Sequence, residues 1–178
     1  MNIILTASGA LPSVTNGAMD VAQSETPTNR QNDAFVDFAA GVQSFCEWSL
    51  VAPFFYGGDP LTFNVYWTTT SSSTNAVVWG LQARAFSPGD AIDSPYGTAI
   101  EVTSPNTGAN QEVVSATPTQ PNALTVAGIS SAHEPGIANS LVTCQRMKFR
   151  LYRLGSGADT LAATARVSMV RLLMAGPP

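Results

Sequence analysis

The chain has 178 residues and a formal net charge of −4, and only 11% of its residues are charged. A chain of this length can bury one substantial core as a single domain. Its acidic balance leaves no basic patch to neutralise phosphates, so we expect no nucleic-acid partner. No apolar stretch is long enough to span a membrane and the first residues lack the basic start of a signal peptide, so we expect synthesis in a cytoplasm and no membrane partner.

Residues 1–34 are small and polar and show no sustained periodicity. Such a segment has little to bury, so we expect an extended or loosely ordered N-terminal arm, followed by one β-sandwich domain over residues 35–178. The apolar residues at its start could anchor the arm on a partner or add an edge strand to a sheet. The candidate partner-binding residues of the arm are Ile3, Ile4, Leu5, Leu11 and Arg30.

After the arm, apolar and polar residues alternate with a period of two, which is typical of half-buried strands. The alternation is clearest in residues 61–67, 76–86 and 142–154, and Trp67 and Trp79 fall on its inward phase. Further strands are expected at residues 35–38, 44–50, 98–103, 111–117, 123–129 and 164–174. About eight short strands separated by Gly, Pro, Ser and Asn loops predict an all-β fold, a jelly-roll-like antiparallel β-sandwich.

Most of the cationic residues gather late in the chain. The group consists of Arg146, Lys148, Arg150, Arg153, Arg166 and Arg171. The alternation places these cations on the solvent face of two C-terminal strands. The more specific alternative is that these cations form a basic stripe that contacts an acidic partner subunit.

No catalytic or metal-binding constellation stands out in the sequence. His133 is the only histidine, which is too little for a triad or a metal site. Asp90 and Asp93 flank a turn, and paired acids can hydrolyse glycosides or bind calcium, but this spacing favours loop capping. Cys46 and Cys144 are distant in sequence and fit two buried thiols. We therefore expect no enzyme, no cofactor and no metal.

Sugar binding would require exposed aromatic side chains as stacking platforms. Trp67 and Trp79 are expected to pack in the core instead. Tyr66 is out of phase with the inward residues of its strand and could be exposed.

Five segments together resemble a known protein family. They are LTFNVYW (61–67), VVWGLQARAFSPGDAID (77–93), YGTAIEVT (96–103), FRLYR (149–153) and DTLAATARVSMVRLLM (159–174). They resemble a family of small virion proteins of tailed bacteriophages, and the resemblance covers roughly residues 61–174. It implies a non-enzymatic virion component with a jelly-roll-like domain that trimerises. The GDAID and DTL segments are interpreted as turn and loop-closing elements.

The resemblance predicts a capsid decoration (cement) protein located on the virion surface after assembly in the host cytoplasm. Such a homotrimer would bind the major capsid protein lattice and stabilise the head, with residues 1–34 contacting the major capsid protein or a neighbouring subunit. The alternative is a receptor- or glycan-binding appendage of a head or tail fibre. Its signature would be exposed Trp or Tyr at one end of the sandwich.

Overall fold

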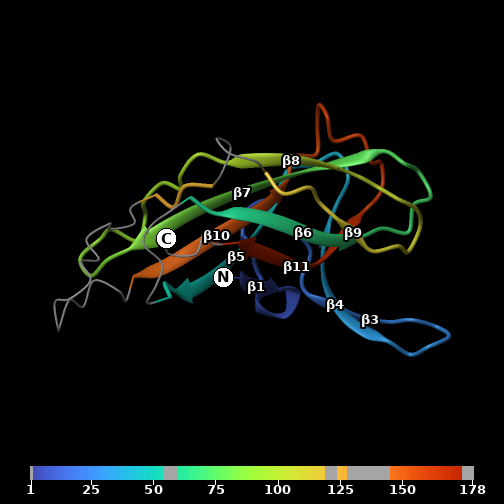
Figure 1. Ribbon diagram of the computed structural model, residues 1–178, viewed down its shortest axis with the longest axis horizontal. Coiled ribbons are helices and arrows are strands. Elements are labelled where there is room, and N and C mark those ends of the chain that lie inside the picture. Colours follow the sequence, from blue (N-terminus) through green and yellow to red (C-terminus); the bar gives the residue numbers. More distant parts are fainter. Residues whose placement is uncertain (1, 54–59, 119–123, 128–144, 174–178) are drawn as a thin grey trace.

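The chain forms an all-β sandwich of two antiparallel sheets in the computed structural model, which describes residues 2–53, 60–118, 124–127 and 145–173 (Figure 1). The first sheet has the order β3-β4-β11-β6-β9, and β1 also pairs with β11. Its strands are β1 (Asn2–Thr6), β3 (Ala22–Glu25), β4 (Asn32–Phe38), β6 (Thr62–Thr68), β9 (Val113–Val114) and β11 (Ala165–Leu173). The predicted fold class is confirmed.

The second sheet has the order β2-β5-β10-β7-β8. Its strands are β2 (Leu11–Pro12), β5 (Ser44–Val51), β7 (Ala76–Phe86), β8 (Ile100–Pro105) and β10 (Arg146–Arg153). A single 3₁₀ turn, η1 (Ala7–Gly9), is the one helical element among the described residues. Within the same residues no helix is long and apolar enough to cross a membrane.

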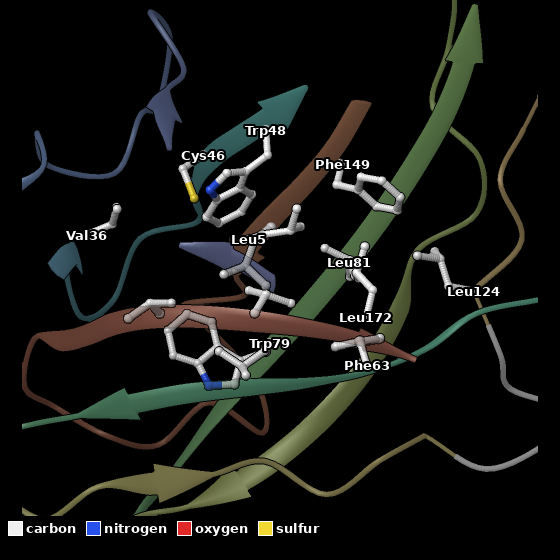
Figure 2. Close-up of a cluster of buried hydrophobic side chains, with 14 of the residues drawn as sticks. Leu5, Val36, Cys46, Trp48, Phe63, Trp79, Leu81, Leu124, Phe149 and Leu172 are labelled. Carbon is white, nitrogen blue, oxygen red and sulfur yellow. The ribbon is translucent and has the colours of Figure 1, made fainter. Parts of the chain in front are cut away.

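The core lies between the two sheets and is built from the inward phase of their strands. Figure 2 shows Phe63, Leu81 and Leu172, from both sheets, pointing toward one another. Trp67 and Trp79 are 1% and 0% exposed and pack edge to face with ring centroids 6.0 Å apart. Edge-to-face packing is favourable because the positive edge of one aromatic ring meets the negative face of the other. The expected core role of both tryptophans is confirmed.

Some strands differ in extent from their predicted ranges. β8 lies two residues later than the segment 98–103, and β9 is only two residues long. Within predicted strand 123–129, the described residues 124–127 make only isolated bridges, from Leu124 to Leu61 and from Ala127 to Arg84. The backbone N–H and carbonyl of Leu124 bond to Leu61, and those of Ala127 bond to Ala83 and Ala85, without a regular ladder.

The N-terminal segment differs from the expected arm. β1 pairs with β11, with Leu5 opposite Val170, and the Leu5 side chain is 4% exposed in the chain's own core. The Trp48 Nε1–H donates to the Thr6 carbonyl at 2.8 Å. β2 extends the second sheet, while β3 and β4 form a hairpin that projects from the sandwich (Figure 1). No structural boundary therefore falls at residue 34, and Ile3, Ile4 and Leu5 belong to an added strand of the chain's own sheet.

Arg153 also differs from its expected position on the solvent face. Its side chain is 0% exposed and meets Asp159, with Nε 2.9 Å from Oδ2 and Nη2 2.8 Å from Oδ1. Arg153 Nη1 donates to the carbonyls of Phe38 and Ala163. Asp159 Oδ2 also accepts the Gly155 N–H at 3.2 Å. Asp159 thus closes the loop after β10, as the interpretation of the DTL segment expects.

Candidate functional site

The five N-terminal candidates do not converge on one surface. Ile3 is half-buried and Ile4 is 47% exposed on β1, whereas Leu5 lies in the core. Leu11 is 68% exposed at the edge of the second sheet. Arg30 lies in the connection between β3 and β4, with a positive φ of 55°. These residues are spread over both sheets, so they form no single site.

The polar candidates of the sequence also stay apart. Asp90 Oδ2 accepts a backbone N–H of its own turn at 2.8 Å, which agrees with loop capping. His133 and Cys144 lie outside the described residues. Cys46 is a buried free thiol, and burial raises its pKa. No three His, Cys, Asp or Glu residues of the described ranges are placed to hold a metal ion.

The outer face of the second sheet brings together polar and aromatic side chains from distant segments. The antiparallel register places Arg150 of β10 between Glu47 of β5 and Gln82 of β7. These residues point outward because their neighbours in sequence fill the core. The side chains gathered around this face are Phe45, Glu47, Gln82, Arg84, Phe86, Tyr96, Arg146, Lys148, Arg150 and Tyr152. We call this surface the outer face.

Arg150 is the best-positioned side chain of the outer face. Its Nε and Nη2 donate to Gln82 Oε1 at 3.0 and 2.7 Å. Its Cζ lies 4.2 Å from the Tyr96 ring centroid and 5.1 Å from that of Phe45, within cation–π range. Nη1 of Arg150 has no hydrogen-bond partner among the described residues. The guanidinium is therefore held in place on one side and can still donate on the other.

A shallow, open pocket of about 520 Å³ lies beside Arg150. Its lining consists of Gln82, Asp93, Ser94, Pro95, Tyr96 and Arg150. Asp93 is exposed, so its carboxylate is available to a ligand. The lining is mostly polar, with one aromatic ring, so it differs from the enclosed, mostly apolar pockets that bind drug-like molecules.

Electrostatic pairing orders the middle of the outer face. Lys148 Nζ lies 2.7 Å from Glu47 Oε2. Burial alone would raise the pKa of the Glu47 carboxyl, but Lys148, the nearby Tyr96 hydroxyl and the charge of Arg150 outweigh it and lower this pKa below its usual 4.5. Burial first, and then the Glu47 carboxylate, raise the pKa of Tyr96. The Tyr96 hydroxyl is buried close to Glu47 without meeting hydrogen-bond geometry.

Tyr152 covers the sheet at the far end of the outer face. Its hydroxyl donates to Glu101 Oε1 at 2.7 Å, and burial, followed by this bond, raises the pKa of Tyr152. A Cβ added to Gly80 would overlap the Tyr152 ring. The absence of a side chain at Gly80 therefore lets the ring lie flat on the strand. Tyr152 is only 5% exposed, so it supports the face rather than offering a ring to a ligand.

The β10 part of the outer face could be predicted from the sequence. The alternation correctly placed Arg146, Lys148 and Arg150 on the outside of their strand. It did not link them to Gln82 or Tyr96, because that proximity depends on the strand register. Tyr66, the aromatic residue whose phase left it free to be exposed, is half-buried on β6 in the other sheet.

The chain matches no family model and has no significant match among curated proteins. Its fold is similar to that of solved carbohydrate-binding modules. The CBM36-1 domain of a multidomain xylanase from the hindgut metagenome of Trinervitermes trinervoides has a TM-score of 0.51 at 8% identity, covering 99% of this chain and 100% of that one. The C-terminal CBM6 of a marine laminarinase from Zobellia galactanivorans has a TM-score of 0.51 at 11% identity. This match covers 98% of this chain and 100% of that one. At such identities the likeness shows a shared jelly-roll β-sandwich fold.

Proposed function

We propose that this chain is a non-catalytic glycan-binding β-sandwich, with its ligand site on the outer face around Arg150. The observation that carries the proposal is the convergence of Arg150, Gln82 and Tyr96 beside an open pocket. The fold shared with carbohydrate-binding modules supports it.

Binding at this site needs no chemistry beyond hydrogen bonds and ring contact. The free Nη1 of Arg150 donates to a sugar hydroxyl, and the Asp93 carboxylate accepts from a neighbouring one. The Tyr96 ring provides apolar contact for the carbon face of a sugar. Because Gln82 already holds the guanidinium, little side-chain freedom is lost on binding. An open, polar pocket of this kind suits a polyhydroxylated chain that passes over the sheet.

The resemblance to tailed-phage virion proteins extends the proposal to a biological setting. A receptor- or glycan-binding appendage of a phage head or tail would meet polysaccharide on the host surface. Several copies on one virion would add avidity without any new contact in the site. Weak binding by a single chain is therefore compatible with this role.

Capsid decoration is the second candidate, and one observation favours it. Leu11, Val14 and Met19 are 68%, 107% and 61% exposed. They lie on a segment held along β5, where the Phe45 carbonyl accepts the Ala18 N–H at 2.9 Å. Exposed apolar residues in one segment suit burial against the major capsid protein or another copy of a homotrimer. Both of these partners are predictions of the resemblance.

The test is titration calorimetry of the full chain against a panel of neutral and acidic polysaccharides and purified host-surface polysaccharide. Arg150→Ala should weaken binding about tenfold or more, because a hydrogen bond to a charged group is lost. Arg171→Ala, the same substitution at a cation on the opposite sheet, is the matched control and should bind as the unaltered chain does. A folded chain that binds none of the panel overturns the proposal. Co-sedimentation with capsid shells lacking this protein would then favour decoration.

A further inference from the structure

Cationic side chains gather on the outer face although the chain as a whole is acidic. Arg84, Arg146, Lys148 and Arg150 are four of the eight Lys and Arg residues of the chain, and all lie on β7 or β10. The register places Arg84 directly opposite Lys148. Like charges at directly opposed positions of neighbouring strands destabilise a sheet. The juxtaposition of Arg84 and Lys148 is therefore not itself a stabilising contact of the sheet.

Two of these cations have no carboxylate partner. Lys148 pairs with Glu47, but Arg84 and Arg146 form no ion pair within the described ranges. Both guanidinium groups instead lie over the Phe86 ring, with their Cζ atoms 5.7 and 4.9 Å from its centroid. Arg84 Nε is buried and has no hydrogen-bond partner there. The positive charge at this end of the face is uncompensated by the residues that the structure describes.

Arg146 is separated from the pocket along the strand, whereas Arg84 is two residues from Gln82 of the pocket lining. Arg146 and Arg150 are four residues apart on β10, which corresponds to about 13 Å at the usual rise of a strand. A ligand that contacts both positions must extend over roughly this distance, as a glycan chain of several sugar units does. Its charged group would meet Arg84 and Arg146, while its hydroxyls meet Arg150 and Asp93. Guanidinium groups bind carboxylate and sulfate oxygens through paired N–H donors.

We infer that the ligand of the outer face is an anionic polysaccharide, whose carboxylate or sulfate groups are bound by Arg84 and Arg146. This inference rests on the proposed function and adds the class of glycan to it. The neutral part of the same chain occupies the pocket beside Arg150. Binding of this class weakens with added salt, because the contacts between charges are screened.

The experiment compares pairs of polymers that differ only in charge. Polygalacturonate is paired with its fully methyl-esterified form, and dextran sulfate is paired with dextran, so that the pairs separate carboxylate from sulfate recognition. We expect the full chain to bind the charged member of one pair at least tenfold more tightly, with an affinity that falls as salt rises. Arg84→Gln combined with Arg146→Gln should remove this preference. Arg171→Gln, which removes one positive charge from the other sheet, should keep it.

The possible failures are distinguishable. Equal affinity for charged and neutral members of both pairs overturns the inference and leaves glycan binding intact. Absence of binding to every polysaccharide tested overturns both proposals. Binding of single-stranded DNA as tightly as the charged polysaccharide shows unspecific attraction of polyanions, and also overturns the inference. Thermal unfolding of each variant confirms that it is folded. Arg84→Lys combined with Arg146→Lys should keep part of the preference, because it retains both charges but not the paired N–H donors.

Discussion

Arg153 and Asp159 form a fully buried two-point ion pair that connects the two sheets. Arg153 ends β10 in the second sheet, and its Nη1 reaches the carbonyl of Phe38 at the end of β4 in the first sheet at 3.2 Å. Asp159 holds the guanidinium at 2.8 and 2.9 Å, and the two side chains are 0% and 1% exposed. Each charge is therefore compensated only by the other and by backbone groups.

Removing one partner of this pair should strongly destabilise the fold. Asp159→Asn or Arg153→Met leaves a buried charge or buried donors without a partner, so we expect a loss of about 3–5 kcal/mol in the free energy of unfolding. Urea unfolding measures it. Asp37→Asn is the control, because its pair with Arg166 is partly exposed and should be worth less than about 1 kcal/mol. Equal losses for the two pairs would contradict this account.

Leu5 should behave as a core residue although it belongs to the segment expected to be an arm. Leu5→Ala removes a side chain that is 4% exposed, so we expect a loss of about 2–5 kcal/mol in the free energy of unfolding. Ile4→Ala, one residue earlier and 47% exposed, should change it by about 0.5 kcal/mol or less. Chemical denaturation of the two variants side by side is the measurement. If residues 1–34 formed a detached arm, neither substitution would change the free energy of unfolding.

Gly80 should tolerate no side chain while Tyr152 is present. Gly80→Ala forces the Tyr152 ring away from the strand, and overpacking of this kind destabilises by about 1–3 kcal/mol. In a chain that already carries Tyr152→Ala, Gly80→Ala should cause much less destabilisation. A double-mutant cycle measures this difference as the coupling free energy between the two positions. Gly9→Ala is the control, since a Cβ there makes ordinary contacts. Additive effects of the Gly80 and Tyr152 changes would show that the ring does not depend on the glycine.

Glu47 should contribute to stability at neutral pH and lose that contribution in acid. Its carboxyl pKa is lower in the folded chain than the ordinary 4.5, so the contribution is complete above about pH 4.5 and disappears as the pH falls through the folded pKa. Glu47→Gln has no such titration. The difference in the free energy of unfolding between the two proteins should therefore shrink below pH 4.5. A constant difference from neutral to acidic pH would show that the pairing with Lys148 does not stabilise the fold.

Much of the fold could be predicted because several strands have one apolar and one polar face. The segments that became β6, β7 and β10 show this alternation over seven or more residues. β1 shows almost none, since only Leu5 among its five residues is fully buried. A strand whose other side chains face solvent or remain partly covered carries too little periodicity to be recognised. Its place is decided by pairing with β11, which local sequence does not encode.

The interpretation of the cations failed at Arg153 for a related reason. Arg153 shares the inward phase of Met147, Phe149 and Leu151, so the periodicity indicates burial while the charge alone suggests solvent. The deciding partner, Asp159, follows a glycine-containing loop. The candidate site depends even more on tertiary structure. Gln82, Tyr96 and Arg150 meet only after β7 and β10 have paired.

β11 has three partners, and this has a consequence for synthesis of the chain. β1 and β4 lie end to end along one edge of β11, while β6 lies along the other. All three are translated long before β11 leaves the ribosome. Pairings between such distant segments form slowly, and unpaired strand edges favour aggregation. We therefore expect nascent chains that lack β11 to depend on chaperones, and their solubility to rise sharply once β11 has been made.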